Sequence, residues 1–394
     1  MTTPSEFPAP LLTAPWSARL RHFQDFTVAH PRLVDAKERL LAAIRECAPN
    51  SVILVLGPTG VGKTTLRTRV EQLLTAESLA ALQTDPARLP VVSVEAVAPP
   101  SGNFNWRDHF RRMLYEMNEP LIDQKRKMEG CDVDVQFMPG IKAHGEQYHY
   151  AVEQALRYRR PRAVLVDEAQ HLAKMASGRR LLDQLDVIKS IANRTGTVHV
   201  LFGTYDLLAF RNLSGQLSRR SVDVHFCRYR ACNAEDRRTF LNVLGSFERQ
   251  MPLPEPPELV ANWEFLYERS IGCVGVLKEW LVRALAAALS RGASKLTVRD
   301  LAAQALMISQ CEKMLAEVTE GEARLTESDG ARSRFRLALG LPGIEVDQGR
   351  MTAPAPAQPR AMPGHSAARV STATARRSGW SAAVSPDSTK PESR

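Results

Sequence analysis

Residues 57–64 read Gly57-Pro58-Thr59-Gly60-Val61-Gly62-Lys63-Thr64, which matches the pattern GxxxxGK[ST]. The match directly follows the apolar stretch Val52 to Leu56 and precedes a helical pattern from Leu66 to Leu74. Glycines in such a loop let backbone N–H groups converge on phosphate oxygens at the N-terminus of a helix. The stretch therefore predicts a phosphate-binding loop in a nucleotide-binding α/β domain.

Two residues of this loop have side chains suited to ATP and Mg²⁺. Lys63 is expected to reach the outer phosphates, and the Thr64 hydroxyl to ligate the metal ion. The residues predicted to bind ATP are Gly57, Pro58, Thr59, Gly60, Val61, Gly62, Lys63, Thr64 and Thr65.

A second apolar run, Ala163 to Val166, ends in two carboxylates, Asp167 and Glu168. Alone, this pattern is typical of a strand that ends at solvent. Roughly a hundred residues after a phosphate loop, it predicts the acidic pair of an ATPase. Asp167 is then expected to hold Mg²⁺, and Glu168 to accept a proton from the attacking water.

Two further positions are candidates for catalysis. Thr204 follows the apolar run Val198 to Phe202, where its hydroxyl would orient the water, although a turn threonine has the same pattern. Arg219 and Arg220 precede the last predicted strand, and one of them is a candidate arginine finger for a neighbouring subunit. A solvated basic pair is the alternative. A finger acting between subunits requires an oligomer.

Short β-branched runs alternate with helical patterns, which predicts a five-stranded parallel sheet with helices on both faces. The predicted strands are Val52 to Leu56, Val91 to Glu95, Ala163 to Val166, Val198 to Phe202 and Val222 to Phe226. From Glu235 onward only helical patterns occur, one of them opened by a capping box at Thr297 and Asp300. We predict an N-terminal arm (1–31), a nucleotide-binding domain (32–234), a helical lid (235–318), a short extension (319–350) and a disordered basic tail (351–394).

Composition limits the remaining possibilities. The 394 residues are 44% hydrophobic and 24% charged, as in globular proteins. The formal charge is +9, but seven basic and two acidic residues lie between Arg350 and Arg394, so the tail holds more than half of the excess. The six cysteines form no CxxC pair, and no apolar run is long enough to span a bilayer. We therefore expect a cytoplasmic protein with reduced thiols and no membrane contact.

The segment from Ser101 to Lys142 is longer than a minimal connection and rich in cations. Its candidate DNA contacts are Arg107, Arg111, Lys125, Arg126, Lys127 and Lys142. Such cations would bind phosphates independently of sequence, but acids are nearly as frequent here, so a solvated surface remains an alternative. Trp106 and Phe110 are interpreted as core anchors. Near the C-terminus, an apolar patch between Phe335 and Leu341 is a possible docking motif.

The order of these motifs resembles that of AAA+ ATPases. The residues within the motifs resemble, more narrowly, those of the TniB/TnsC family of transposition regulators. The stretches that carry this resemblance are Gly57 to Leu66, Val166-Asp167-Glu168-Ala169-Gln170-His171-Leu172, Phe202-Gly203-Thr204-Tyr205-Asp206-Leu207 and Gly272-Cys273-Val274-Gly275-Val276-Leu277. The resemblance covers roughly residues 32–315.

The resemblance implies an ATP-dependent homo-oligomer, a ring or a helical filament, on double-stranded target DNA. Such a protein links a target-selector protein to the transposase, is disassembled by ATP hydrolysis and is itself neither nuclease nor transposase. Thr204 takes the place of the first sensor. Many AAA+ proteins carry a sensor arginine near the motif around Gly275. Lys278 is the nearest cation here and is therefore a further candidate for binding ATP.

Two other functions remain open at this point. The stretch Asp167-Glu168-Ala169-Gln170-His171 also occurs in secretion-associated AAA+ ATPases, so a secretion-associated or signalling ATPase that acts on a protein partner is an alternative. An adaptor that binds nucleotide without turnover is a third possibility, against which the complete acidic pair argues.

Overall fold

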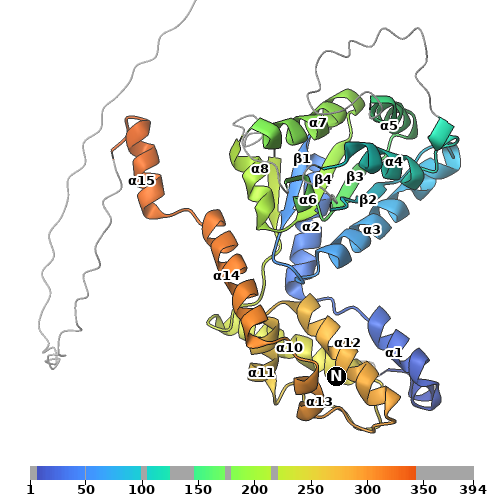
Figure 1. The fold of residues 1–394 in the computed structure, drawn as a ribbon, viewed down its shortest axis with the longest axis vertical. Helices are drawn as coiled ribbons and strands as arrows, with labels where there is room; N and C mark the ends of the chain where they lie inside the picture. The colour runs from blue at the N-terminus through green and yellow to red at the C-terminus, as the bar shows by residue number, and fades with distance from the viewer. Residues whose placement is uncertain are drawn as a thin grey trace, which may run out of the picture. The chain divides into compact units, whose positions relative to one another are not determined.

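The computed structural model describes residues 7–48, 50–98, 104–124, 146–173, 179–213 and 221–342 (Figure 1). The described residues up to Glu327 form one compact unit, and those from Ser328 onward belong to a second. The predicted basic tail, 351–394, lies outside the described residues. Among the helices in the described ranges, none is long and apolar enough to cross a membrane.

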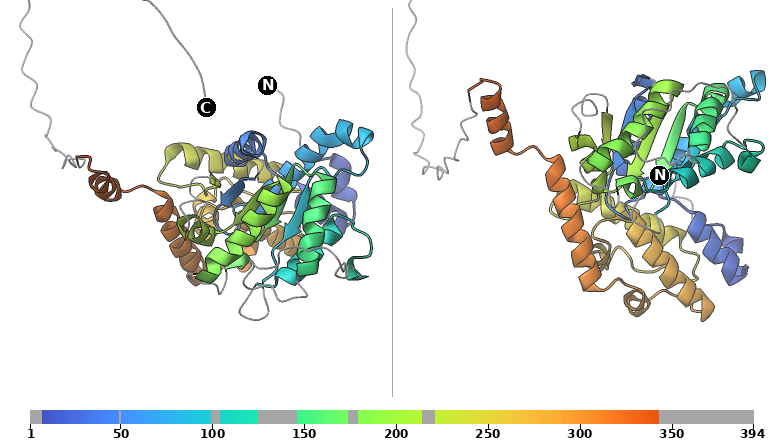
Figure 2. Two further views of the ribbon diagram at one scale, coloured as in Figure 1. Left: turned by 90° about the horizontal axis from the view of Figure 1, so that it is seen from above. Right: turned by 45° about the horizontal axis from the view of Figure 1, so that its top comes forward.

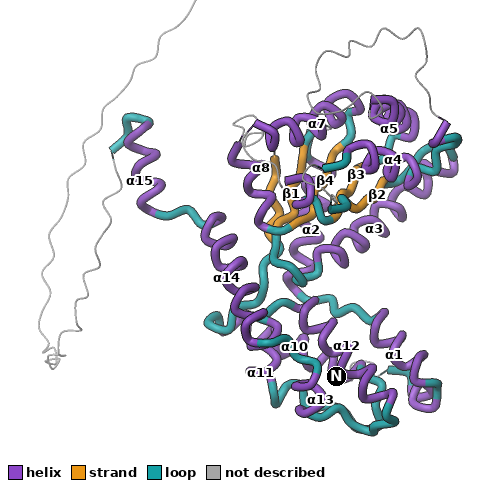
Figure 3. The backbone as a smooth tube through the Cα atoms, in the orientation of Figure 1, coloured by secondary structure: helices purple, strands orange, loops and turns teal. Residues whose placement is uncertain are grey.

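Five parallel strands form the sheet of the first unit, shown in orange in Figure 3. They are β1 (Val52–Leu56), β2 (Val92–Glu95), β3 (Ala163–Asp167), β4 (Val198–Gly203) and β5 (Ser221–His225). Their order is β2-β3-β4-β1-β5, and each neighbouring pair is parallel. All five strands are predicted correctly to within one residue at each end. Because the strands are parallel, the segments that follow β1, β3 and β4 meet at one edge.

Helices cover both faces of this sheet, as predicted (Figure 2). Alternate residues of β1 point to opposite faces, so that Ile53 packs in one core and Leu54 in the other. One face is covered by α2 (Pro31–Glu46) and α3 (Lys63–Thr84). The other is covered by α4 (Trp106–Glu116), α5 (Glu146–Arg159), α7 (Arg179–Thr195) and α8 (Leu208–Leu213). Trp106 and Phe110 are buried in this second core, which confirms them as core anchors.

The helices that follow the sheet in the chain form a hydrophobic core of their own. Its helices are α10 (Ala234–Gln250), α11 (Trp263–Ser270), α12 (Val274–Ser290) and α13 (Val298–Ala303). The predicted capping box of Thr297 and Asp300 opens α13. Phe23 of α1 (Trp16–Asp25) is fully buried in the same core, so the N-terminal helix packs on the helical region, preceded by the short helix η1 (Ala9–Thr13).

Helix α14 (Ile308–Leu325) runs through position 318, where the sequence placed the end of the lid. It packs on the short helix η3 (Tyr205–Leu207), which follows β4. At this contact Gly321 lies directly on the ring of Tyr205. Beside it, the carboxylate of Glu322 is 3.0 Å from Nη2 of Arg230 and 3.5 Å from Nε of Arg228. Helix α14 is thereby joined to the sheet domain by packing and by ion pairs.

The second unit contains α15 (Asp329–Ala338), whose first turn is capped by the Ser328 hydroxyl. Phe335, Leu337, Leu339 and Leu341 are all exposed, between 45% and 64%. The apolar patch predicted from the sequence is therefore exposed on this helix and the residues after it.

We expect the substitution Gly321→Ala to destabilise the protein. A Cβ atom at this position would lie 2.1 Å from Cδ2 of Tyr205, so the ring or the helix must move. Alanine favours helices over glycine by about 1 kcal/mol, but overpacking of this kind costs about 1–3 kcal/mol. The free energy of unfolding in urea, measured for the full chain, should fall accordingly.

The matched control is Gly245→Ala in α10, where a Cβ atom would meet the end of the Arg249 side chain at 3.3 Å and Cγ2 of Val260 at an ordinary van der Waals distance of 3.7 Å. This variant should be as stable as the wild type or more stable. If both substitutions had the same effect, the close packing of α14 on Tyr205 would be refuted.

Candidate nucleotide-binding site

The phosphate loop leaves the end of β1 and turns back into the first turn of α3. Two of its glycines have left-handed backbone angles, with φ of 71° at Gly60 and 112° at Gly62, which caps α3. Such angles cost other residues about 1–2 kcal/mol each. A Cβ atom on Gly57 would lie 2.3 Å from the carbonyl oxygen of Phe226, so the loop also packs too closely for a side chain. The N–H groups of the first turn of α3 are thereby left facing the loop interior.

Lys63 is the buried cation of this site, with only 7% of the residue exposed. Its ammonium donates to the carbonyl oxygens of Gly57 at 3.0 Å and Pro58 at 2.9 Å. Burial lowers the pKa of Lys63, while the carboxylates of Glu168 and Asp167 act in the opposite direction. The Lys63 ammonium therefore lies inside the loop, next to the acidic pair. An anionic ligand bound there would stabilise its charged form.

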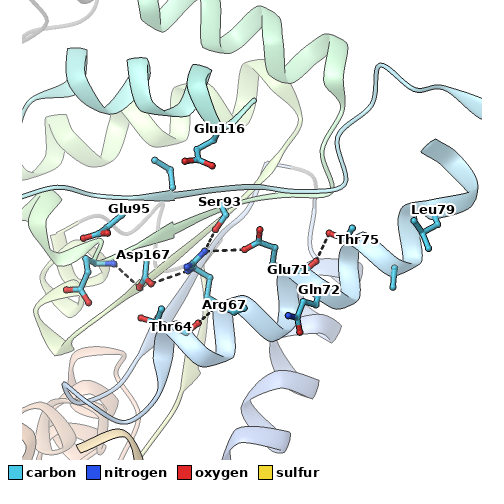
Figure 4. Close-up of a pocket in the computed structure, with 14 residues that line it drawn as sticks. Thr64, Arg67, Glu71, Gln72, Thr75, Leu79, Ser93, Glu95, Glu116 and Asp167 are labelled. Carbon is cyan, nitrogen blue, oxygen red and sulfur yellow. Dashed lines mark hydrogen bonds and ion pairs between the residues drawn. The ribbon is translucent and has the colours of Figure 1, made fainter. Parts of the chain in front are cut away.

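Thr64, Asp167 and Glu168 line one cleft of about 1080 Å³, shown in Figure 4. Asp167 is 5% exposed, and its Oδ1 accepts the N–H of Glu168 at 3.0 Å. The Glu168 side chain is 40% exposed, so its carboxylate is accessible from the cleft. The structure thus brings the predicted metal ligands and the predicted base to the same edge of the sheet.

Arg67, which the sequence analysis missed, lies at the centre of this cleft (Figure 4). Its Nε donates to Oδ2 of Asp167 at 3.1 Å, and its Nη1 donates to Oε2 of Glu71 at 3.2 Å and to the hydroxyl of Ser93. The available signal was its position one helical turn after Lys63, which places both residues on the same side of α3. Both oxygens of Asp167 are therefore held in place.

Thr204 follows β4 and lies near the phosphate loop. Its hydroxyl donates to Oδ2 of Asp206 at 3.1 Å. Pro58, Thr59 and Thr204 share the lining of a smaller pocket of about 230 Å³. The predicted sensor threonine is thus adjacent to the loop, with its hydroxyl directed to a carboxylate.

A third pocket, of about 130 Å³, joins the phosphate loop to the N-terminal segment and the helical region. Val61, Gly62 and Thr65 line it from the loop, and Gly275 and Lys278 from α12. Apolar and polar side chains both contribute to the lining of this pocket beside the loop.

The ammonium of Lys278 is bound by the N-terminal segment. It donates to the carbonyl oxygen of Phe26 at 3.0 Å and to that of Phe23, and it lies 3.8 Å from the centroid of the Phe23 ring. Burial lowers the pKa of Lys278 to about 8. The cation predicted to be near the nucleotide therefore fastens helix α1 to helix α12.

Helix α12 begins directly on the phosphate loop. The N–H of Val276 donates to the carbonyl oxygen of Gly60 at 3.0 Å. A Cβ atom on Gly275 would lie 2.4 Å from that same oxygen, so the approach requires glycine. The helical region is thus in contact with the residues that are predicted to hold the phosphates.

Of the remaining predicted residues, the two that the structure describes do not line this site. Arg107 is exposed, with its guanidinium 5.8 Å from the centroid of the Tyr148 ring, and Arg111 pairs with Asp123 at 2.7 Å. Six predicted positions lie outside the described residues. They are Lys125, Arg126, Lys127, Lys142, Arg219 and Arg220.

The sheet order, the phosphate loop and the acidic pair identify the nucleotide-binding region. Residues 47–210 match the family model of the AAA domain. The fold is that of AAA+ P-loop ATPases, with a parallel five-stranded sheet followed by helices. The match to this family model implies ATPase activity. No curated protein matches the sequence.

Several solved structures are similar to this chain at low identity. The Aeropyrum pernix ORC2 protein in ADPNP–ADP complexes shares 15% identity, with 73% of this chain and 71% of that chain covered and a TM-score of 0.47. Drosophila ORC bound to DNA shares 14%, with 86% and 78% covered and a TM-score of 0.45. Aeropyrum pernix ORC1 in complex with DNA shares 19%, with 73% and 68% covered and a TM-score of 0.45. Similarity this distant does not extend to function.

The substitution Arg67→Met should destabilise the nucleotide-free AAA domain. It leaves the buried carboxylate of Asp167 without its guanidinium partner, and loss of one partner of a buried pair costs about 3–5 kcal/mol, less where the pair is partly solvated. Urea denaturation at neutral pH should detect a loss of at least about 1 kcal/mol.

The control is Arg69→Met on the next position but one of α3, where the guanidinium bonds to Gln72 at the surface. Its effect should stay within about 0.5 kcal/mol. Equal stability of the two variants would contradict a role for Arg67 in holding Asp167.

Proposed function

We propose that this chain is an ATP-dependent, DNA-binding regulator of DNA transposition of the TniB/TnsC type. In this proposal it oligomerises on double-stranded target DNA, connects a target-selector protein to the transposase and disassembles when ATP is hydrolysed. The observation that carries the nucleotide chemistry is the convergence of Lys63, Asp167 and Glu168 at one edge of the sheet.

Hydrolysis is assigned to residues of the phosphate loop, of the cleft beside it and of the segment that follows β4. Lys63 would bind the outer phosphate oxygens, and Glu168 would take a proton from the water that attacks the γ-phosphorus. The bond from that phosphorus to the ADP oxygen then breaks. Thr204 would report whether the γ-phosphate is present.

The donors present fit Mg²⁺, since a threonine hydroxyl and a nearly buried carboxylate are oxygen ligands of the type that this ion prefers. Thr64 and Asp167 would hold it. When bound, the ion would neutralise charge that develops on the phosphate oxygens.

Oligomer formation is supported by the lack of a free cation among the described residues that line the cleft. Transition states of phosphoryl transfer are stabilised by a cation near the γ-phosphate. Lys63 would supply one such cation from the loop. Among the described residues that line the cleft, Arg67 is the one further cation, and it is bound to Asp167 and Glu71. A second copy of the chain would supply the further cation, for which Arg219 and Arg220 are the candidates.

The assignment to transposition rests on the wording of the four motifs between Gly57 and Leu277. DNA binding is supported by the net positive charge and by the exposed Arg107 at the start of α4. Arg111 is a weaker candidate, because Asp123 neutralises its charge.

Assembly on DNA tests the proposal. The full chain, mixed with duplex DNA and a non-hydrolysable ATP analogue at low salt, should form oligomers visible by electron microscopy. With ATP, the wild-type oligomers should disappear over time, whereas those of Glu168→Gln should persist because the base is lost.

The control is Glu116→Gln, which neutralises another carboxylate of the same cleft and should disassemble like the wild type. Failure to assemble on DNA with the analogue would refute the DNA-bound oligomer. ATPase stimulation by a protein partner and not by DNA would instead favour the secretion-type alternative.

A further inference from the structure

The side-chain amide of Gln170 connects two parts of the candidate site. Its Nε2 donates to Oε2 of Glu168 at 2.5 Å, and its Oε1 accepts the N–H of Thr204 at 3.3 Å. Gln170 begins the short helix α6 (Gln170–Ala173), directly after the turn that follows β3. One residue outside the predicted set thus contacts both the predicted base and the predicted sensor.

The main chain around Glu168 is tightly held. Glu168 has a φ of 51°, a left-handed angle that costs a residue with a side chain about 1 kcal/mol or more. On one side the N–H of Glu168 donates to Asp167, and on the other the N–H of Ala169 donates to the carbonyl oxygen of Phe202 at 2.8 Å. With the backbone fixed to β4, the direction of the Glu168 carboxylate depends on its side-chain contacts.

The end of β4 leaves room for the Gln170 amide. A Cβ atom on Gly203 would lie 2.6 Å from Oε1 of Gln170 and 2.7 Å from Cδ1 of Leu207. The backbone of Gly203 is not left-handed, so the close packing of these two side chains accounts for the glycine.

We infer that Gln170 is a positioning residue, which orients the Glu168 carboxylate and couples it to Thr204. This inference rests on the proposed ATP hydrolysis. Through Gln170, a shift of the Thr204 backbone in response to the γ-phosphate moves the base toward or away from the attacking water. Catalytic groups displaced by about 1 Å lose roughly a hundredfold in rate, so small shifts suffice.

Two other groups face Glu168 within the described residues. Nε2 of His171 is 4.0 Å from Oε2 of Glu168, and Lys63 lies close enough to interact electrostatically. Neither contacts Thr204, so neither couples the base to the sensor in the way that Gln170 does.

Two substitutions in the full chain distinguish a residue that positions Glu168 from one that only binds the Thr204 N–H. Gln170→Glu keeps an oxygen that accepts the Thr204 N–H but loses the donor to Glu168, whereas Gln170→Met loses both. Positioning predicts that kcat for ATP falls by about tenfold or more in both variants, while KM changes by less than about threefold. If Gln170 only accepted the Thr204 N–H, Gln170→Glu would keep the wild-type kcat. That result would overturn the inference.

The control is Gln83→Met, which removes an exposed glutamine near the C-terminal end of α3, outside the lining of the cleft, and should leave kcat unchanged. Thermal melting and the affinity for a fluorescent ATP analogue confirm that each variant folds and binds nucleotide. If Gln170→Met failed to fold, Gln170→Glu would still decide the question.

A double variant tests the coupling directly. Because Gln170 acts through Glu168, adding Gln170→Met to Glu168→Gln should slow hydrolysis no further. An additional loss equal to that of the single variant would contradict the inference. A wild-type chain without ATPase activity would refute the proposed function itself, whereas an inactive Glu168→Gln beside fully active Gln170 variants would refute only the inference.

Discussion

The site is organised around a buried positive charge. Lys63 loses most of its hydration at the end of a buried strand, and an unpaired cation there is costly. The carbonyl oxygens of Gly57 and Pro58 and the nearby carboxylates offset this cost. Since the loop must wrap around the ammonium, Gly60 and Gly62 take angles that other residues avoid. A polyphosphate in the loop would supply the anion that the lysine lacks.

The parallel sheet explains how distant motifs meet at this charge. Leu56 pairs in register with Gly203, and Glu95 with Asp167, so the ends of β1, β3 and β4 lie at one edge. Helix α12 reaches the same edge through Gly60, and helix α14 reaches it through Tyr205. A conformational change at this edge of the sheet could therefore reach the helical region through either of these two contacts.

The sequence predicted the sheet and the main functional segments because apolar periodicity and glycine patterns are local properties. It did not predict Arg67 or Gln170 as part of the site, since their roles depend on side-chain contacts with β3 and β4. Lys278 stays a predicted ATP-binding residue, since it lines a pocket together with Gly62 and Thr65 of the loop. The carbonyl groups that bind its ammonium belong to the N-terminal segment, far away in sequence, and were not predicted. Contacts of this kind follow only from the tertiary fold.

The central claim is that the AAA domain hydrolyses ATP at the loop around Lys63. Release of inorganic phosphate from ATP by the full chain, with and without Mg²⁺, measures this most directly. The account predicts Mg²⁺-dependent turnover that is lost in Lys63→Ala while the far-ultraviolet circular dichroism is retained. Absence of turnover in the wild type, or equal turnover in Lys63→Ala, would contradict it.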